Sequence, residues 1–389
     1  MTDVREQDLY FDFNATTPVA AEVREAMLPY LGERFGNPSS DSRLGRAARE
    51  AVEAARAEVA ALIGARPDEI VFTGGGTEAS NLAIRGAGPA DGAAVVTSTI
   101  EHPATEACCA LLERAGRSVR RVAARADGVL DPDDLARAID GVTGLVTLIH
   151  AQNEIGTLQP VAAAAALARA AGALVHADAA QSLGKVPVDV TALGVDLLSI
   201  AGHKLYAPKG VGALFVRRGV SLRPVIVGAG QERGLRPGTE NVPCIVGLGV
   251  ACRLARETLA ETGPRLARLT AGLLERLRAE VPGLVLVGEG AERLPNTLNL
   301  LFPGVSGRAL IGATARVVAS TGSACHAGSE APSSVLLALG IDPASALGAV
   351  RLSLGRGTTD AEVEAGAADL ADAWRRLAAG TIIRRGVSA

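Results

Sequence analysis

Short apolar segments that alternate with helical segments most constrain the fold of this chain. Residues 45–63 carry apolar side chains every three to four positions and end at Gly64, which is typical of an amphipathic helix. Helical stretches such as 160–171 then separate several short strand-like segments. The strand candidates span residues 69–73, 93–98, 119–123, 145–150, 173–177, 196–200 and 211–216. This alternation favours an α/β fold with a largely parallel sheet.

The C-terminal part of the chain shows a different pattern. Helix dominates residues 250–280, and short strand candidates follow at 284–287 and 297–302. A last helix is predicted to begin at Thr359, because Thr359 and Glu362 have the spacing of a capping box. This part is therefore predicted to be α+β rather than parallel α/β.

These patterns divide the chain into two predicted domains. The first is a large domain over residues 15–255, which contains the parallel sheet. The second is a smaller α+β domain formed by residues 1–14 together with 256–389. The chain has 389 residues, 48% of them hydrophobic, which is enough for one large core and a second, smaller one.

Composition limits the partners and the location. The net charge of −3 leaves no basic surplus for nucleic acid or an anionic membrane. The first ten residues lack the apolar stretch of a signal peptide, and the most apolar helical run, 161–168, is too short to span a bilayer. We therefore expect a soluble, cytoplasmic protein that binds neither nucleic acid nor membranes.

The five cysteines form no CxxC pair, so the sequence favours free thiols and predicts no metal site. Four of them fall in predicted helices and are expected to be small buried apolar groups. These four are Cys108, Cys109, Cys244 and Cys252. Cys325 differs, because it lies in a segment rich in Gly, Ser and Ala and precedes His326. A loop thiol with a basic neighbour is typical of a reactive thiolate.

Lysine is rare in this chain. Of 39 basic residues only Lys185, Lys204 and Lys209 are lysines, and the rest are arginines. A retained lysine can do what arginine cannot, such as form a Schiff base. Chance survival in a sequence with biased coding explains the three lysines equally well.

A glycine-rich turn, residues 73–78, follows the first strand candidate and opens a helical stretch. Gly76 lets the backbone approach a ligand, the helix start offers free N–H groups to a phosphate, and Thr77 adds a hydroxyl. The turn lacks the GK[ST] of a P-loop, so a nucleoside triphosphate is not favoured. Alone, the turn is equally typical of a plain strand–helix connection.

Two further polar residues follow strand candidates. Asp178 comes just after 173–177, at the sheet edge where open α/β folds bind ligands, and its carboxylate can pair with a protonated ring nitrogen. Lys204 follows 196–200, and burial there would lower its pKa and make it nucleophilic. An Asp that caps the next helix and a solvated Lys are the alternatives for each residue alone.

Taken together, these segments resemble a known family. The motifs FTGGGTEASNLAI, TIEHPA, AQNEIGTLQP, HADAAQSLGK, AGHKLYAPKG, GQERGLRPGTEN, GSACHAG and RLSLGRGTT occur in order, and YFDFNATTPV and GERFGNPSS precede them. They resemble the cysteine desulfurase and selenocysteine lyase group of fold-type-I enzymes that use pyridoxal 5′-phosphate (PLP). The resemblance covers about residues 10–375. It implies a fold-type-I PLP-dependent transferase with a mainly parallel sheet in its large domain.

The resemblance also implies a role for each matching residue around the cofactor ring. Lys204 would hold PLP as a Schiff base. Asp178 would pair with the pyridine nitrogen, and Gln181 would bond the ring hydroxyl oxygen. His102 would stack on the ring and help to move protons.

Further implied roles concern the cofactor phosphate and the substrate. Gly76, Thr77 and His203 would bind the phosphate. Thr239 would reach the phosphate of the partner subunit, which implies a homodimer. The substrate carboxylate would be held by Asn153 and Arg351, and an arginine suits a bidentate carboxylate contact. Cys325 would accept the substrate sulfur.

The implied reaction is conversion of L-cysteine to L-alanine, with Lys204 taking the Cα proton and Cys325 carrying the sulfur away as a persulfide. An acceptor protein, such as an iron–sulfur scaffold in cluster assembly, would then receive the sulfur. A selenocysteine lyase is the alternative, because SACHAG and GQERGLRPGTEN resemble that version of the motifs. A PLP transaminase or β-lyase, which would not need Cys325, and a binding partner without catalysis also stay open.

Two residues depart from the common desulfurase pattern. Ala201 stands where a phosphate-binding serine is common, so one hydroxyl contact is missing. Gln152 replaces a common asparagine before Asn153. The segment that carries Cys325 is long, as in desulfurases that supply iron–sulfur scaffolds, and for this reason we favour L-cysteine over selenocysteine.

Overall fold

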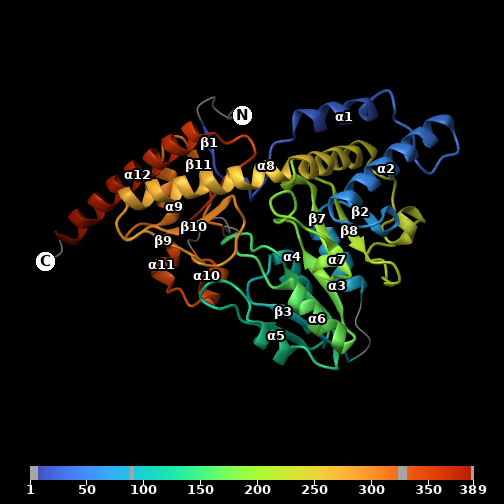
Figure 1. Cartoon of the computed structure of the whole chain (residues 1–389), viewed down its shortest axis with the longest axis horizontal. Helices are drawn as coiled ribbons and strands as arrows, with labels where there is room; N and C mark the ends of the chain where they lie inside the picture. The colour runs from blue at the N-terminus through green and yellow to red at the C-terminus, as the bar shows by residue number, and fades with distance from the viewer. Residues whose placement is uncertain (1–7, 88–91, 323–330, 387–389) are drawn as a thin grey trace.

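A computed structural model of the chain describes residues 8–87, 92–322 and 331–386. Within them, a seven-stranded sheet forms the centre of the larger part of the molecule (Figure 1). In their order across the sheet, the strands are β2 (Ile70–Thr73), β8 (Gly212–Val216), β7 (Leu197–Ala201), β6 (Leu174–Asp178), β5 (Thr143–Ile149), β3 (Ala94–Ser98) and β4 (Val119–Val122). Each strand candidate of the large domain corresponds to one of them. The predicted mainly parallel sheet is confirmed, although β8 runs antiparallel to both β2 and β7.

Helices cover this sheet, and side-chain caps define where several of them begin. The helix predicted at 45–63 is α2 (Arg43–Leu62), whose first turn is capped by the Ser42 hydroxyl, and Gly64 follows with a left-handed φ of 68°. The other helices of this part are α1 (Ala21–Leu31), α3 (Gly76–Gly86), α4 (Pro103–Arg114), α5 (Pro132–Ala138), α6 (Val161–Ala171) and α7 (Val190–Leu193), with short 3₁₀ turns η1 (Pro67–Glu69), η2 (Gly202–Lys204) and η3 (Gln231–Gly234).

The helix α8 (Val242–Glu280) connects the two parts of the molecule and runs across Figure 1 below α1. It packs against α1 and α2 at one end and against α12 (Asp360–Gly386) at the other. The sequence predicts helix only from residue 250, but the Asn241 side chain caps the helix earlier by accepting a hydrogen bond from Cys244 N. No helix in the described ranges is both long and apolar enough to cross a membrane.

The smaller part contains an antiparallel sheet and a short two-stranded parallel sheet. Its strands are β12 (Ala349–Ser353), β10 (Thr297–Leu301) and β9 (Val285–Leu286) in the first sheet, and β1 (Leu9–Tyr10) and β11 (Val317–Val318) in the second. Its helices, besides α12, are α9 (Gly307–Ala313), α10 (Ser334–Ala338) and α11 (Pro343–Leu347). The predicted capping box is confirmed, because Thr359 N donates to Glu362 Oε2 and Glu362 N donates to Thr359 Oγ1.

Hydrophobic side chains gather in two main cores. The larger core packs α2, α6 and the first half of α8 against the seven-stranded sheet. The second core joins Leu9 and Phe11 near the N-terminus to the second half of α8, β10, β12 and α12. A boundary at residue 255 falls inside α8, which contributes to both cores. The division into domains 15–255 and 1–14 plus 256–389 stays a prediction.

A buried ion pair fixes the segment before α8. The Arg56 guanidinium on α2 bonds both carboxylate oxygens of Glu232 at 2.7 and 2.8 Å, and Phe72 N donates to the same carboxylate. The two side chains are only 8% and 3% exposed. Removal of Glu232 leaves the buried Arg56 charge with only the exposed carboxylate of Glu53, at 3.1 Å, which is costlier than loss of a surface pair.

Replacement of Glu232 therefore has a large expected effect on stability. Glu232→Ala should lower the free energy of unfolding by about 3–5 kcal/mol. The same change in an exposed pair, Glu257→Ala beside Arg253, should cost less than about 1 kcal/mol. Urea unfolding of the two variants measures both values, and equal losses would contradict a structural role for the buried pair.

Candidate active site

Most of the predicted site residues lie around one cavity at the carboxyl edge of the parallel strands. This cavity has a volume of about 680 Å³. Among its lining residues are Gly76, Thr77, His102, Asn153, Asp178, Gln181, His203 and Lys204. Loops after β2, β3, β5, β6 and β7 supply them, so residues separated by more than a hundred positions meet at one sheet edge, as expected for an open α/β fold.

Lys204 ends the 3₁₀ turn η2 that follows β7. Its Nζ donates hydrogen bonds to the backbone oxygens of Asn14 and Ala15. Burial, reinforced by the positive charge of Arg351, lowers the pKa of Lys204 from 10.5 to about 8. A larger fraction of this amine is therefore neutral near pH 7 than for a solvated lysine, as a Schiff-base lysine requires.

This lowered pKa predicts how cofactor uptake depends on pH. Only the neutral amine of Lys204 attacks an aldehyde, and its fraction increases as the pH rises toward about 8. Below that value, the rate of covalent PLP uptake by the apoprotein should rise about tenfold per pH unit, and above it the rate should level off. Stopped-flow absorbance measures this rate. A rate that keeps rising up to pH 10 would indicate an ordinary solvated lysine instead.

Asp178 and His102 line the same cavity. Asp178 is the last residue of β6 and accepts a hydrogen bond from Ala180 N at 3.0 Å, and burial raises its pKa. His102 caps α4, where its Nδ1 accepts from Ala104 N at 3.1 Å. Burial lowers the pKa of His102, and the capping bond assigns the proton of the neutral ring to Nε2. A neutral, fixed imidazole is suited to stacking.

The start of α3 forms a cradle for an anion. Gly75 has a φ of 151°, and a Cβ on Gly76 would lie 3.0 Å from the Ala201 Cβ, so α3 approaches the end of β7 closely. The free N–H groups of the first turn and the Thr77 hydroxyl line the cavity there. His203 lies at the same wall with a pKa lowered to about 4, mainly by burial, and is therefore a neutral donor.

Arg351 lies on β12, in the smaller part of the molecule, and reaches the site through Asn153. Its Nη1 donates to the Asn153 backbone oxygen at 3.0 Å, while Nη2 binds Asp12 Oδ1 at 2.6 Å and Ser320 Oγ at 3.0 Å. Its buried Nε has no partner among the described residues. The sequence gives no signal for the contact with Asp12, because the two residues lie at opposite ends of the chain.

One predicted cofactor residue does not lie at this cavity. Thr239 is exposed in the segment between η3 and α8 and does not line the cavity of its own chain. Cys325 and His326 lie outside the described residues. Burial raises the pKa of both Cys109 and Cys252 to about 12, which fits their expected role as apolar groups.

Several polar residues near the site have structural roles. The His176 ring is fully buried between Thr147 and Ser199, with hydrogen bonds of 2.8 Å to both hydroxyls. Gln152, the unusual residue before Asn153, accepts from Ile155 N at 3.0 Å and so shapes the turn that presents Asn153. The replacement of the common asparagine by Gln152 therefore changes a residue that supports the shape of this loop.

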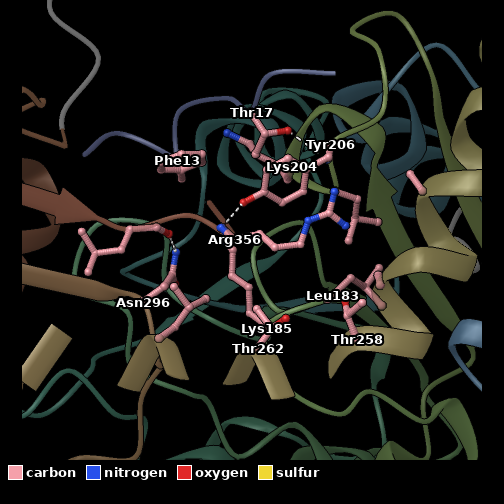
Figure 2. Close-up of a pocket in the computed structure, with 16 residues that line it drawn as sticks. Phe13, Thr17, Leu183, Lys185, Lys204, Tyr206, Thr258, Thr262, Asn296 and Arg356 are labelled. Carbon is pink, nitrogen blue, oxygen red and sulfur yellow. Dashed lines mark hydrogen bonds between the residues drawn. The ribbon is translucent and has the colours of Figure 1, made fainter. Parts of the chain in front are cut away.

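A second, much smaller cavity of about 30 Å³ lies behind Lys204, at the junction of the two parts (Figure 2). Lys185, Lys204 and Tyr206 reach it from the larger part, Thr262 from α8 and Asn296 from the smaller part. Lys204 lines both cavities. The sequence did not indicate that Lys185 is buried here.

These observations fit PLP and define a fold-type-I PLP-dependent enzyme. The cavity combines a half-buried lysine of low pKa, a buried carboxylate at the end of an adjacent strand and an anion cradle at a helix start. PLP needs these three groups for its aldehyde, its ring nitrogen and its phosphate.

Comparison with known proteins identifies the family. The Aminotransferase class-V profile matches residues 9–365, so the chain belongs to the class-V aminotransferase family of PLP enzymes. "Cysteine desulfurase IscS" of Anaeromyxobacter dehalogenans is 46% identical over 92% of this chain and 90% of its own length. A solved "NifS-like protein" superposes with a TM-score of 0.88 at 35% identity, covering 94% of this chain and 98% of its own. A structure described as "SspA in complex with cysteine" has a TM-score of 0.80 at 36% identity, covering 90% and 99%.

Proposed function

We propose that the chain is a PLP-dependent cysteine desulfurase, which converts L-cysteine to L-alanine and transfers the sulfur to Cys325 as a persulfide. The observation that carries this proposal is the single cavity in which Lys204, Asp178 and His102 meet the anion cradle of α3. Relatives named cysteine desulfurase, similar over about nine-tenths of the chain, support the same reaction.

In this proposal each residue has a defined task. Lys204 would hold PLP through its side-chain amine, and the same amine, when free, would take the Cα proton. Asp178 pairs with the ring nitrogen and Gln181 bonds the ring hydroxyl oxygen. The neutral imidazole of His102 stacks on the ring. When bound, PLP supplies an electron sink for the charge that develops as Cα loses its proton.

The remaining predicted residues bind the phosphate and the substrate. Gly76, Thr77 and His203 would hold the phosphate through N–H and O–H donors. Arg351 and Asn153 hold the substrate carboxylate. Arg351 is already bonded to the Asn153 backbone, so movement of one of them is transmitted to the other.

The sulfur transfer balances without an external oxidant. The Cys325 thiolate attacks the substrate sulfur, so that an S–S bond forms while the Cβ–S bond breaks. Cβ gains a proton, and the proton of the substrate thiol remains with the persulfide. Carbon is thereby reduced and sulfur oxidised to the persulfide level, and alanine leaves. An acceptor protein, such as an iron–sulfur scaffold, then takes the terminal sulfur.

We further propose that the protein is a cytoplasmic homodimer, in which Thr239 contacts the cofactor phosphate of the partner subunit. Thr239 is exposed and does not line the cavity of its own chain, which supports this arrangement. Large apolar side chains are also exposed on two segments. Ile226 and Val227 lie before η3, and Leu28, Leu31 and Phe35 lie on α1 and in the turn after it. Exposed apolar groups of this kind are typical of subunit interfaces.

The experiment that tests the function compares two substrates. The purified PLP-loaded protein is incubated with L-cysteine and, separately, with L-selenocysteine, and alanine is quantified. Alanine from L-cysteine is the expected result. Alanine from selenocysteine alone would make the protein a selenocysteine lyase, and no alanine from either substrate despite bound PLP would contradict both functions.

A further inference from the structure

Lys185 is a buried lysine to which neither the family motifs nor the proposed reaction gives a role. Its side chain is 8% exposed, whereas Lys209 is exposed. Its Nζ donates to Gln181 Oε1 at 2.8 Å and to Asn14 Oδ1 at 2.9 Å. Burial, together with the charges of Lys204 and Arg351, lowers its pKa well below the usual value. An amine is costly to bury, so its retention here calls for a function.

We propose that Lys185 is a positioning residue that fixes the side-chain amide of Gln181, so that a Gln181 N–H faces the cofactor ring. This inference rests on the proposed function, in which Gln181 contacts the ring hydroxyl oxygen. Lys185 itself touches neither substrate nor cofactor in this arrangement.

The hydrogen bonds of Gln181 leave its amide a single satisfactory orientation. Its Oε1 accepts from the Lys185 amine, and its Nε2 donates to the Asn14 backbone oxygen at 2.9 Å. A flipped amide would place an N–H group against the Lys185 donors and an oxygen against the Asn14 carbonyl. Both hydrogen bonds would then be lost inside the protein, where unpaired polar groups are costly.

The fixed orientation matters because Gln181 lines the large cavity with Asp178 and Lys204. The amide nitrogen has two N–H groups, of which Asn14 engages one. The second can donate to a ring hydroxyl oxygen and stabilise its ionised form. If the amide were flipped, Gln181 Oε1 would face the ring hydroxyl oxygen and repel it. Lys185, together with the Asn14 backbone oxygen, thereby holds Gln181 in the orientation that attracts the ring substituent.

Asn14 extends this network to the smaller part of the molecule. Its backbone oxygen also accepts from Lys204 Nζ, and its side chain bonds Thr297 Oγ1 on β10 at 2.9 Å. Its Oδ1, which accepts from Lys185, is 3.3 Å from Asn296 Nδ2. Asn296 and Lys185 both line the small junction cavity in Figure 2. Lys185 thus lies between the cofactor cavity and the contact of the two parts.

A double-mutant cycle tests this inference. Lys185→Met keeps an unbranched side chain without a donor, Gln181→Leu removes the ring contact, and the third variant combines both. For each apoprotein, equilibrium dialysis gives the Kd for PLP, and absorbance against pH gives the titration of the bound cofactor. Thr262→Val is the control, because it changes a residue that α8 contributes to the same small cavity and leaves both hydrogen bonds of Lys185 in place.

We expect each single substitution to weaken PLP binding about tenfold and to shift the cofactor titration to higher pH, because a donor to the ionised ring oxygen is lost. The double variant should be no worse than Gln181→Leu alone, since Lys185 acts through Gln181. Thr262→Val should bind PLP as the original protein does. If Lys185→Met yields no folded apoprotein, Lys185→Leu, which also lacks a donor, takes its place in the cycle with the same expectations.

Two results would overturn the inference. One is a Lys185 variant with unchanged Kd and unchanged titration. The other is a double variant in which the two fold-changes multiply, because Lys185 would then act independently of Gln181. The readouts do not depend on turnover. A protein that binds PLP with these shifts but forms no alanine would contradict the proposed function alone.

Discussion

Lys204→Ala is expected to abolish covalent PLP binding and to slow alanine formation from L-cysteine by at least roughly 10⁴-fold. The substitution removes both the group that bonds the cofactor aldehyde and the base that takes the Cα proton. Burial gives this lysine a pKa of about 8. Asp178 and the neutral His102 line the same cavity, but neither occupies the position of the Lys204 amine, so neither replaces the lost base. Absorbance of the purified variant and a single-turnover alanine assay measure the two effects.

A labelling experiment on the unmodified protein provides the control. Borohydride reduction of the PLP-loaded enzyme, followed by peptide mapping, should place the cofactor on Lys204. Lys185 is engaged by Gln181 and Asn14, and Lys209 lines the cavity but is exposed and does not follow a sheet strand as Lys204 does. A label on either of these lysines, or alanine formation by Lys204→Ala at the original rate, would contradict the assignment.

Cys325→Ser should have the second large effect, a loss of sustained alanine formation of at least roughly 10³-fold, since removal of an attacking nucleophile is among the costliest single changes in an enzyme. The variant should still bind PLP and respond spectrally to L-cysteine, because the residues around the cavity remain in place. Steady-state alanine formation and absorbance spectra measure the two properties separately.

Cys244→Ser is the matched control for this prediction. Cys244 is a half-buried free thiol at the start of α8, so the same substitution there should leave the rate of alanine formation unchanged. A normal rate in Cys325→Ser would instead favour a transaminase or β-lyase of the same fold, which needs no thiol.

Much of the fold follows from local patterns in the sequence. In a sequence, buried parallel strands appear as short apolar segments, and each such segment predicted in the large domain does form a strand. The direction of β8 could not be predicted, because periodicity carries no information on strand polarity. The first turns of α8 were also missed, since residues 242–249 are rich in valine and glycine, which favour helix weakly. Burial against α1 and α2 overrides that local preference.

The candidate site also contains both residues that the sequence could predict and contacts that it could not. Asp178 and Lys204 could be found because each follows a buried strand, so their position at the sheet edge is a local property of the sequence. The pair of Arg351 and Asp12 could not, because the two residues are 339 positions apart and meet only when β12 packs beside the N-terminal segment. The burial of Lys185 was missed for the same reason, since its partner Asn14 lies 171 positions away in the sequence.

The measurement that tests the central claim most directly is a single turnover of the PLP-loaded protein with L-cysteine, in which alanine and the persulfide on Cys325 are both quantified by mass spectrometry. A cysteine desulfurase should form the two products in equal amounts, with no other sulfur acceptor present. Alanine without a persulfide, or bound PLP that yields no alanine, would contradict sulfur transfer to Cys325 as the function of this enzyme.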